Sequence, residues 1–211
     1  HDASWIVQEE GAQVLAQLVG ARPGERVLDA CAGRGNKAWV LADGVGPLGA
    51  VHVADLHAAK LEQAARGPLA GRPGPVHPGA WSHGPADVPG GFDRVLVDAP
   101  CSGVGTLRRR PEIARRRTPD DVLCLAELQL AITRRAATRA RVGGRVVYAV
   151  CSVLVEEAES VVEQLLAGGD AEGRELRLSP FDARPEEGPP PRPARPAEPL
   201  RPPPLPRSIR P

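Results

Sequence analysis

The sequence predicts an α/β fold with a doubly wound, mainly parallel sheet, and three observations support this prediction. Short apolar runs of the kind that forms buried parallel strands recur along the chain. Segments with apolar residues at helical spacing alternate with these runs. A loop with polar residues follows each run, where open α/β sheets hold their ligands. The strands are expected at residues 26–29, 50–54, 92–98 and 145–150, with a short one near Val76.

Length and composition indicate one globular domain. The chain has 211 residues, of which 42% are apolar and only 3% aromatic, so its core must consist mainly of Val, Leu and Ala. Its net charge of +1 is unevenly distributed. Between Cys101 and Arg145 there are 11 Arg and 4 acidic residues, whereas between Glu156 and Gly188 there are 10 acidic residues and 3 Arg. The basic sector could attract a polyanion, although a solvated helix face explains such a run equally well.

The cysteines indicate a reducing compartment. Cys31, Cys101, Cys124 and Cys151 are widely spaced and form no C-x-x-C pair. This spacing argues against a zinc site or a disulfide framework, so we expect no metal and reduced thiols in a cytoplasmic protein. The sequence shows neither a signal peptide nor an apolar run long enough to span a bilayer, so no membrane association is expected.

The first half of the chain has the pattern of a cofactor-binding unit. An amphipathic helix is expected over residues 5–20, and a helix through Trp39 and Leu41 should connect the first two strands. The loop at 30–37, ACAGRGNK, separates the first strand from that helix, and Asp55 ends the second strand. This order of strand, glycine loop, helix, strand and acid is typical of nucleotide-type cofactor sites.

Each part of this loop has a physical role in such a site. Gly33 and Gly35 let the backbone approach a ligand closely, and the start of the following helix offers free N–H groups. Asp55 is suitably placed to accept hydrogen bonds from ribose hydroxyls. Glycine turns alone are common, so the acid after the second strand carries much of the prediction.

The second half predicts two helices and a tail. Thr118, Pro119 and two acids form a helix start, and apolar residues at helical spacing continue the helix until Gly143 and Gly144 break it. Another helical pattern covers residues 154–167. From residue 180 onward 13 of 32 residues are proline, so we expect a folded domain over 1–179 and a disordered tail over 180–211.

Two thiols and a carboxylate are predicted to face one cleft. Asp98 and Cys101 follow the strand at 92–98, and Cys151 follows the strand at 145–150. Cys151 also precedes the helix expected at 154–167, whose N-terminal dipole would favour the thiolate. The alternative is that these thiols are small buried apolar residues. We favour that alternative for Cys124, which lies within an apolar helix pattern.

Three stretches together carry a family resemblance. They are VLDACAGRGNK at 27–37, FDRVLVDAPCSG at 92–103, and VVYAVCS at 146–152 followed by the acidic segment EEAES. They resemble the S-adenosylmethionine-dependent RNA (cytosine-5) methyltransferases of the Sun/Fmu (NSUN) type, and Gln129 in the long helix fits as well. DAPCSG paired with a second Cys-Ser is far more specific than either half. The resemblance covers roughly residues 5–168 and implies a Rossmann-like class I methyltransferase fold.

The resemblance also implies roles for individual residues. Cys151 matches the nucleophile that adds to carbon 6 of cytosine, and Cys101 the thiol that assists proton removal from carbon 5 and enzyme release. Asp98 would hold the cytosine edge, and the arginine-rich segment would meet phosphates of the RNA, either rRNA or tRNA. The enzyme is expected to act as a monomer. S-adenosylmethionine would be held by Cys31, Ala32, Gly33, Arg34, Gly35, Asn36, Lys37, Asp55 and Asp98.

Three departures from the family pattern keep alternatives open. The family's cofactor loop usually reads like APGGK, so the side chain of Asn36 could crowd the cofactor. Trp81 stands near the position of an acid that touches adenine, and would stack on the ring instead. The final strand of the family's sheet has no counterpart in the Pro-rich tail. A degenerate relative that binds RNA or a partner without catalysis is therefore the first alternative. A dinucleotide-dependent oxidoreductase is the second, but it leaves DAPCSG and the paired cysteines unused.

Overall fold

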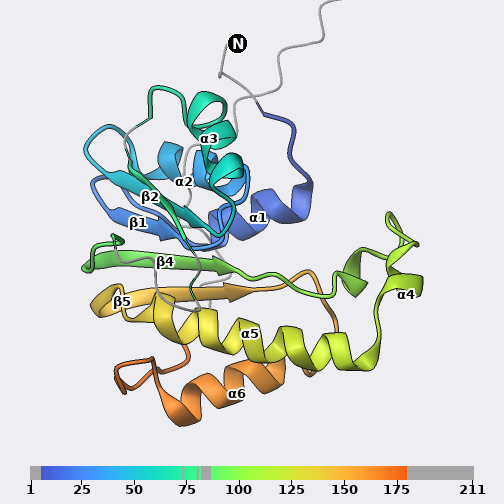
Figure 1. The fold of residues 1–211 in the computed structure, drawn as a ribbon. Coiled ribbons are helices and arrows are strands. Elements are labelled where there is room, and N and C mark those ends of the chain that lie inside the picture. The colour runs from blue at the N-terminus through green and yellow to red at the C-terminus, as the bar shows by residue number, and fades with distance from the viewer. Residues whose placement is uncertain (1–5, 73, 80, 82–86, 180–211) are drawn as a thin grey trace, which may run out of the picture. The chain divides into compact units, whose positions relative to one another are not determined.

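The fold is built on one parallel sheet of five strands. A computed structural model describes residues 6–72, 74–79, 81 and 87–179. The strands run in the order β3-β2-β1-β4-β5, and all neighbours are parallel (Figure 1). Their bounds are β1 Arg26–Asp29, β2 Ala50–Asp55, β3 Val76–Pro78, β4 Phe92–Asp98 and β5 Ala140–Ala149. The predicted α/β, mainly parallel fold is confirmed.

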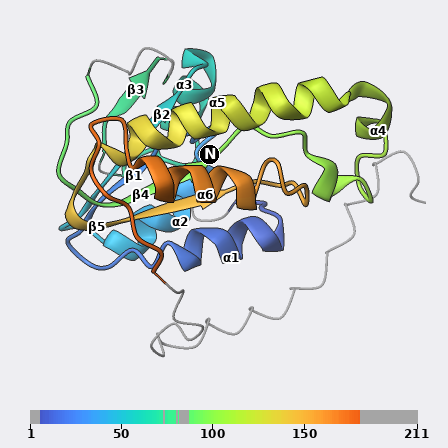
Figure 2. The same cartoon turned by 90° about the horizontal axis from the view of Figure 1, so that it is seen from below.

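Helices cover both faces of this sheet. α1, α2 and α3 lie on one face, and α5 and α6 lie on the other (Figures 1 and 2). A 3₁₀ turn at Val104–Thr106 and the short α4 lie between β4 and α5. The helix bounds are α1 Glu10–Leu18, α2 Asn36–Val45, α3 Ala58–Arg66, α4 Ile113–Arg116, α5 Pro119–Ala137 and α6 Glu159–Gly168. The fold is therefore doubly wound, as predicted.

Alternation along the strands explains why both faces are covered. Val27 and Leu96 belong to the apolar cluster under α1, α2 and α3, whereas their neighbours Leu28, Val95 and Val97 belong to the cluster on the α5 face. Since successive side chains of a strand point to opposite faces, an apolar residue at every position requires a helical layer on each side. These continuous apolar runs are the reason why the sequence predicts the fold class so clearly.

The strand order reverses at β1, and this reversal positions the site. β1 pairs with β2 on one side and with β4 on the other, so the loops after β1 and β4 leave the same edge in opposite directions. The segment with α4 projects beyond the carboxyl ends of β4 and β5 (Figure 1). Ligands of open α/β sheets bind at such a reversal point.

The start of α5 is confirmed, but the end of this helix differs from the prediction. α5 ends at Ala137, and Gly143 and Gly144 lie within β5 instead of breaking a helix. Gly143 has a φ of +75°, and a Cβ on Gly144 would lie 3.0 Å from the carbonyl oxygen of Phe92. The pairing of β4 and β5 shifts register at this point. The glycines therefore allow an irregularity within a strand that begins earlier than expected.

Two other helices are shorter than predicted. α1 begins at Glu10, and Val7 and Val14 are 82% and 46% exposed, so much of the expected apolar face is not buried. α6 begins only at Glu159, after turns at residues 155–158. In both cases apolar residues at helical spacing continue beyond the segment that packs against the core. Because packing supplies most of the stability of a short helix, the helix forms only over the packed segment.

The disordered tail that is expected over 180–211 lies outside the described residues. β5 is an edge strand, and no strand follows it in the part of the chain that the structure describes. None of the described helices is long and apolar enough to cross a membrane.

The capping box at the start of α5 makes a testable contribution to stability. The amide of Asp121 donates to Thr118 Oγ1 at 3.2 Å, and the amide of Thr118 donates to Asp121 Oδ2 at 2.8 Å. Thr118→Ala removes the first acceptor and should lower the free energy of unfolding in urea by about 1 kcal/mol. Thr118→Ser keeps a hydroxyl and should lose far less. An equal loss in both variants would contradict the cap assignment.

Candidate active site

The residues predicted to form a site do gather at one edge of the sheet. Asp29, Asp55 and Asp98 are the last residues of β1, β2 and β4. Cys101 and Cys151 follow the ends of β4 and β5. Parallel strands place all of these residues at the carboxyl edge, around the point where the strand order reverses. No group of three or more His, Cys, Asp or Glu within the described ranges is arranged to hold a metal ion.

The glycine loop after β1 has the conformation that its sequence predicts. Gly35 caps α2 with a φ of +80°, and a Cβ there would lie 2.8 Å from the Cβ of Ala64. Gly33 has a φ of +55° and nothing within 4 Å of a Cβ, so space is open beside it. The amide of Gly33 donates to Asp55 Oδ2 at 2.9 Å. The loop and the acid after β2 therefore face each other, as a cofactor site requires.

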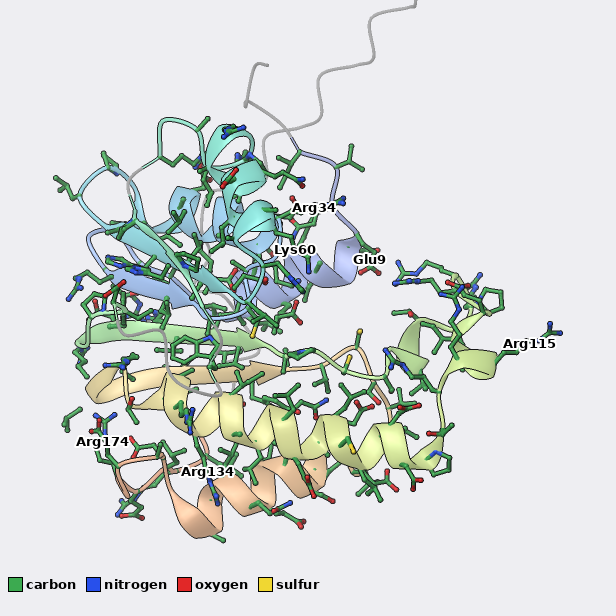
Figure 3. All side chains as sticks on the ribbon, viewed as in Figure 1. Glu9, Arg34, Lys60, Arg115, Arg134 and Arg174 are labelled. Carbon is green, nitrogen blue, oxygen red and sulfur yellow. The ribbon has the colours of Figure 1, made fainter. Side chains whose placement is uncertain are left out.

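The other residues of this loop differ in how far they are available to a ligand. Arg34 is exposed on the side of the sheet that carries α2 (Figure 3). Asn36 is the first residue of α2 and is half-buried. The thiol of Cys31 packs against the apolar cluster on the α5 face. Burial, together with the charge of Asp29, raises the pKa of Cys31, so this thiol stays protonated.

An ion pair connects the cofactor loop with the loop after β4. Lys37 Nζ lies 2.5 Å from Asp98 Oδ2. Burial alone would favour the neutral amine, but the Asp98 carboxylate outweighs burial and raises the pKa of Lys37. Lys37 is therefore charged, and it is held between the two strands on either side of the reversal point.

Asp29 carries a buried carboxyl group that sequence analysis treated only as a strand end. It is 1% exposed, and neither oxygen has a partner in good hydrogen-bond geometry among the described residues, although the amide of Cys31 lies close enough to lower its pKa slightly. Burial raises the pKa of Asp29 to about 7, and the nearby Lys37 offsets part of this shift. The sequence did contain a signal for a functional role of Asp29. An acidic residue at the end of a buried strand is unfavourable to bury unless a partner compensates its charge.

The two predicted thiols are in direct contact. The Sγ atoms of Cys101 and Cys151 lie 3.0 Å apart, and the amide of Cys151 donates to Cys101 Sγ at 3.3 Å. The hydrogen bond with Cys101 lowers the pKa of Cys151 to about 7, against burial and the Asp98 carboxylate, which both raise it, and Lys37 makes only a small contribution to the lowering. The same hydrogen bond, together with burial, raises the pKa of Cys101. At neutral pH one proton therefore remains on Cys101, and Cys151 has thiolate character.

The expected source of this thiolate character is wrong. α6 begins at Glu159, so no helix N-terminus lies at Cys151, and its dipole cannot act there because such effects fall off within one turn. The hydrogen bond from Cys101 takes its place, with a small contribution from Lys37. The interpretation of Cys124 as a buried apolar residue is also wrong, because this thiol is exposed on α5.

Trp81 does not form the stacking surface that the sequence suggested. Its side chain is 4% exposed and belongs to the apolar cluster on the α5 face. The indole Nε1–H donates to the carbonyl oxygen of Ala30 at 2.6 Å, and Arg135 donates to the Trp81 carbonyl. An aromatic side chain with its polar atom satisfied in the core acts as a packing residue.

A buried polar cluster behind the thiols was missed as a functional feature. Glu157, Gln129 and Ser102 are each 2% exposed or less. From the sequence, Gln129 and the segment that contains Glu157 indicated only a family resemblance, and no role was predicted for either residue. A glutamate next to another glutamate before a helix usually faces solvent, so no local pattern distinguishes the buried Glu157 from the exposed Glu156.

The arginine-rich segment lies on the projecting part of the chain. Arg108–Arg110 and Arg115–Arg117 are all exposed, and Arg115 points outward (Figure 3). Arg109 pairs with Glu9 at 2.8 Å, and Arg110 pairs with Glu112 at 3.3 Å. The segment begins shortly after the thiol loop, so a polyanion bound there would lie close to the site.

The raised pKa of Asp29 makes stability depend on pH. Between the ordinary pKa of 3.8 and the folded value of about 7, the unfolded chain loses this proton and the folded chain keeps it, so stability falls as pH rises through this range. Asp29→Asn removes the dependence. Relative to the wild type, this variant should gain roughly 2 kcal/mol more at pH 8 than at pH 5 in urea unfolding. Asp43→Asn, at an exposed site, should follow the wild type, and an Asp29→Asn gain independent of pH would contradict the assignment.

Comparisons with known proteins agree with this geometry. The family model described as 16S rRNA methyltransferase RsmB/F matches residues 16–184. The ribosomal RNA small subunit methyltransferase B of Thermus thermophilus is 41% identical over 166 residues, covering 76% of this chain and 39% of that protein. A probable methyltransferase B of Synechocystis is 33% identical, covering 84% of this chain and 40% of that protein.

Solved structures show the same fold. The crystal structure of a methyltransferase homolog protein from Pyrococcus horikoshii superposes with a TM-score of 0.65 at 28% identity, covering 77% of this chain and 51% of that one. The chain spans about two fifths of the length of the curated relatives that it matches. The resemblance inferred from the three sequence motifs is confirmed, and the chain belongs to the RsmB/F family.

Proposed function

We propose that this chain is the catalytic domain of an enzyme that transfers a methyl group from S-adenosylmethionine to carbon 5 of cytosine in RNA. The contact between the Cys101 and Cys151 thiols, beside the ion pair of Lys37 and Asp98, is the observation that carries the proposal. The names of the relatives favour ribosomal RNA of the small subunit over transfer RNA as the substrate. The proposal extends to a monomer that acts in the cytoplasm.

The residues around the glycine loop fit this cofactor. S-adenosylmethionine has a positively charged sulfonium and an ammonium group, and it supplies a methyl group carried on the sulfonium sulfur. Asp29 has two buried carboxyl oxygens without partners among the described residues, and cationic groups nearby would favour its ionised form. The open space beside Gly33 leaves room for a ligand, and Asp55 is oriented toward the loop and suits ribose hydroxyls.

Cys151 supplies the nucleophile. With a pKa of about 7 it is substantially ionised at neutral pH, and it lies beside Cys101 and the charged Lys37. Its thiolate forms a bond to carbon 6 of the cytosine ring, and the electron pair of the 5,6 double bond moves into the ring. Carbon 5 becomes nucleophilic enough to accept a methyl group. Asp98 and Lys37 orient the polar edge of the base during this addition.

Cys101 changes its role once Cys151 is bonded to the ring. The hydrogen bond to Cys151 is the main reason why Cys101 keeps its proton. A sulfur in a thioether bond no longer carries the negative charge that accepts this hydrogen bond, so the pKa of Cys101 falls. Cys101 can then lose its proton to solvent and accept the proton from carbon 5. Elimination of Cys151 restores the ring and releases the methylated base.

Removal of each thiol is expected to block the reaction at a different step. Cys151→Ala should abolish methyl transfer to a transcript of small-subunit ribosomal RNA, because no adduct at carbon 6 can form. Cys101→Ala should accumulate a covalent protein–RNA adduct, seen in denaturing gels, because proton removal from carbon 5 is blocked. Transfer is measured as incorporation of labelled methyl groups.

The exposed thiol of Cys124 provides a matched control. Cys124→Ala should retain wild-type incorporation and show no adduct. Turnover by Cys151→Ala would overturn the nucleophile assignment, and absence of an adduct in Cys101→Ala with Cys151 intact would overturn the release role. A folded wild-type chain that transfers no methyl group would instead favour the non-catalytic relative.

A further inference from the structure

We propose that Glu157 is a positioning residue, which holds the Cys101 and Cys151 loops together through Ser102 and Ser152 and so fixes the contact between the two thiols. The catalytic meaning of this inference rests on the proposed function. The contact itself can be tested without RNA or methyl transfer. Three sets of contacts and the charge state of Glu157 support the assignment.

Glu157 binds the loop after β4 through two bonds to one residue. The amide of Ser102 donates to Glu157 Oε1 at 2.7 Å, and the hydroxyl of Ser102 donates to Oε2 at 2.5 Å. Glu157 is 0% exposed, so water does not compete for these bonds. Ser102 directly follows Cys101, so a bond to its amide fixes the backbone that carries the thiol.

Glu157 itself belongs to the loop after β5 and helps to fix the shape of that loop. The hydroxyls of Ser102 and Ser152 lie 3.4 Å apart, and the nearby Ser152 hydroxyl helps to lower the pKa of Glu157. Ser152 Oγ accepts from the amide of Leu154 at 3.2 Å, and the amide of Glu157 donates to the carbonyl oxygen of Leu154 at 3.1 Å. The segment from Cys151 to Glu157 therefore turns back so that its carboxylate reaches Ser102, whose hydroxyl lies beside that of Ser152.

Two further side chains hold Glu157 in place, Gln129 at its carboxylate and Tyr148 at its backbone carbonyl. Gln129 Nε2 donates to Glu157 Oε1 at 3.0 Å and to the carbonyl oxygen of Pro100 at 2.9 Å. The hydroxyl of Tyr148 lies 3.0 Å from Gln129 Oε1 and 2.5 Å from the carbonyl oxygen of Glu157. α5 and β5 thereby support the same group that binds the thiol loops, and Pro100 ties in the residue before Cys101.

The charge state of Glu157 is consistent with this arrangement. Burial favours the protonated acid, but hydrogen bonds from Ser102 and Ser152 outweigh burial, so the pKa of Glu157 is lowered. These hydrogen-bond donors, together with Gln129, are all neutral. An ionised carboxylate accepts on both oxygens at once, which an amide cannot do.

The geometry explains why a serine follows each of the two cysteines. The Cys101–Ser102 step directs the serine toward Glu157 and the cysteine toward Cys151, since the thiols are 3.0 Å apart and Ser102 donates to the carboxylate, and the Ser152 hydroxyl lies 3.4 Å from that of Ser102. Reacting groups misplaced by about 1 Å can lose two orders of magnitude in rate. A rigid second layer of hydrogen bonds is the usual means of holding such a separation.

The test uses Glu157→Gln, with Glu156→Gln as the matched control at an exposed neighbouring glutamate. All variants carry Cys124→Ser, so that the exposed thiol forms no intermolecular bonds. Diamide accepts two electrons and two protons from a pair of thiols, which become one disulfide, and mass spectrometry follows formation of the Cys101–Cys151 bond. Circular dichroism checks the fold, and iodoacetamide alkylation over a pH series gives the pKa of Cys151.

Glu157→Gln should form this disulfide about tenfold more slowly or worse, because its amide nitrogen would meet the Ser102 donors and release the loop. Its Cys151 alkylation profile should move to higher pH, because the hydrogen bond from Cys101 weakens. Glu156→Gln should match the parent in both measurements. A folded Glu157→Gln with the parent's disulfide rate and alkylation profile would overturn the proposal, because a purely structural role would alter only the melting temperature.

If Glu157→Gln does not fold, Ser102→Ala and Ser152→Ala carry the same test. Each removes one hydroxyl and leaves the carboxylate in place. Slower disulfide formation in both variants supports the positioning role, and parent-like rates in both overturn it. Because neither readout requires methyl transfer, a negative result here is distinct from failure of the proposed reaction.

Discussion

The ion pair of Lys37 and Asp98 is the interaction on which the candidate site depends most. β1 and β4 are adjacent and parallel, so Asp29 and Asp98 end on the same edge of the sheet, and the start of α2 brings Lys37 between the two loops. Asp29, Asp55 and Asp98 would otherwise repel one another in a partly buried space, and that repulsion contributes to the raised pKa of Asp29. One lysine thus compensates part of this charge and links the cofactor side of the site to the thiol side.

The thiol pair follows a related principle, in which two groups share one proton. Contact between the sulfurs separates their pKa values, so a nucleophile and a protonated partner exist side by side at neutral pH. The hydrogen bond from Cys101 is the main cause that favours the anion on Cys151, Lys37 adds a small contribution, and the polar cluster around Glu157 fixes the loops that carry the thiols. The charge state of the pair therefore comes mainly from the contact between the two thiols, whereas the polar cluster supported by α5 and β5 positions their loops.

Features with a local cause could be predicted from the sequence. Continuous apolar runs predict the strands, the Thr118 hydroxyl and Pro119 predict the start of α5, and Gly35 predicts the turn into α2. The thiol contact could also be predicted, because both cysteines follow parallel strands. Features whose cause is a residue far away in the sequence could not be predicted. The register shift against β4 accounts for Gly143 and Gly144 within β5, the carbonyl of Ala30 explains the burial of Trp81, and only the folded chain distinguishes Glu157 from Glu156.

Titration calorimetry of the folded 211-residue chain with S-adenosylmethionine tests the central claim most directly. The account predicts binding in the micromolar range, about −8 kcal/mol, since the loop is open at Gly33 and the cationic groups meet unpartnered carboxyl oxygens. Asp55→Ala should weaken this binding, whereas Glu156→Gln, far along the chain and exposed, should not. A folded wild-type chain that gives no binding heat at any tested temperature would contradict the account and leave the paired thiols without a methyl donor.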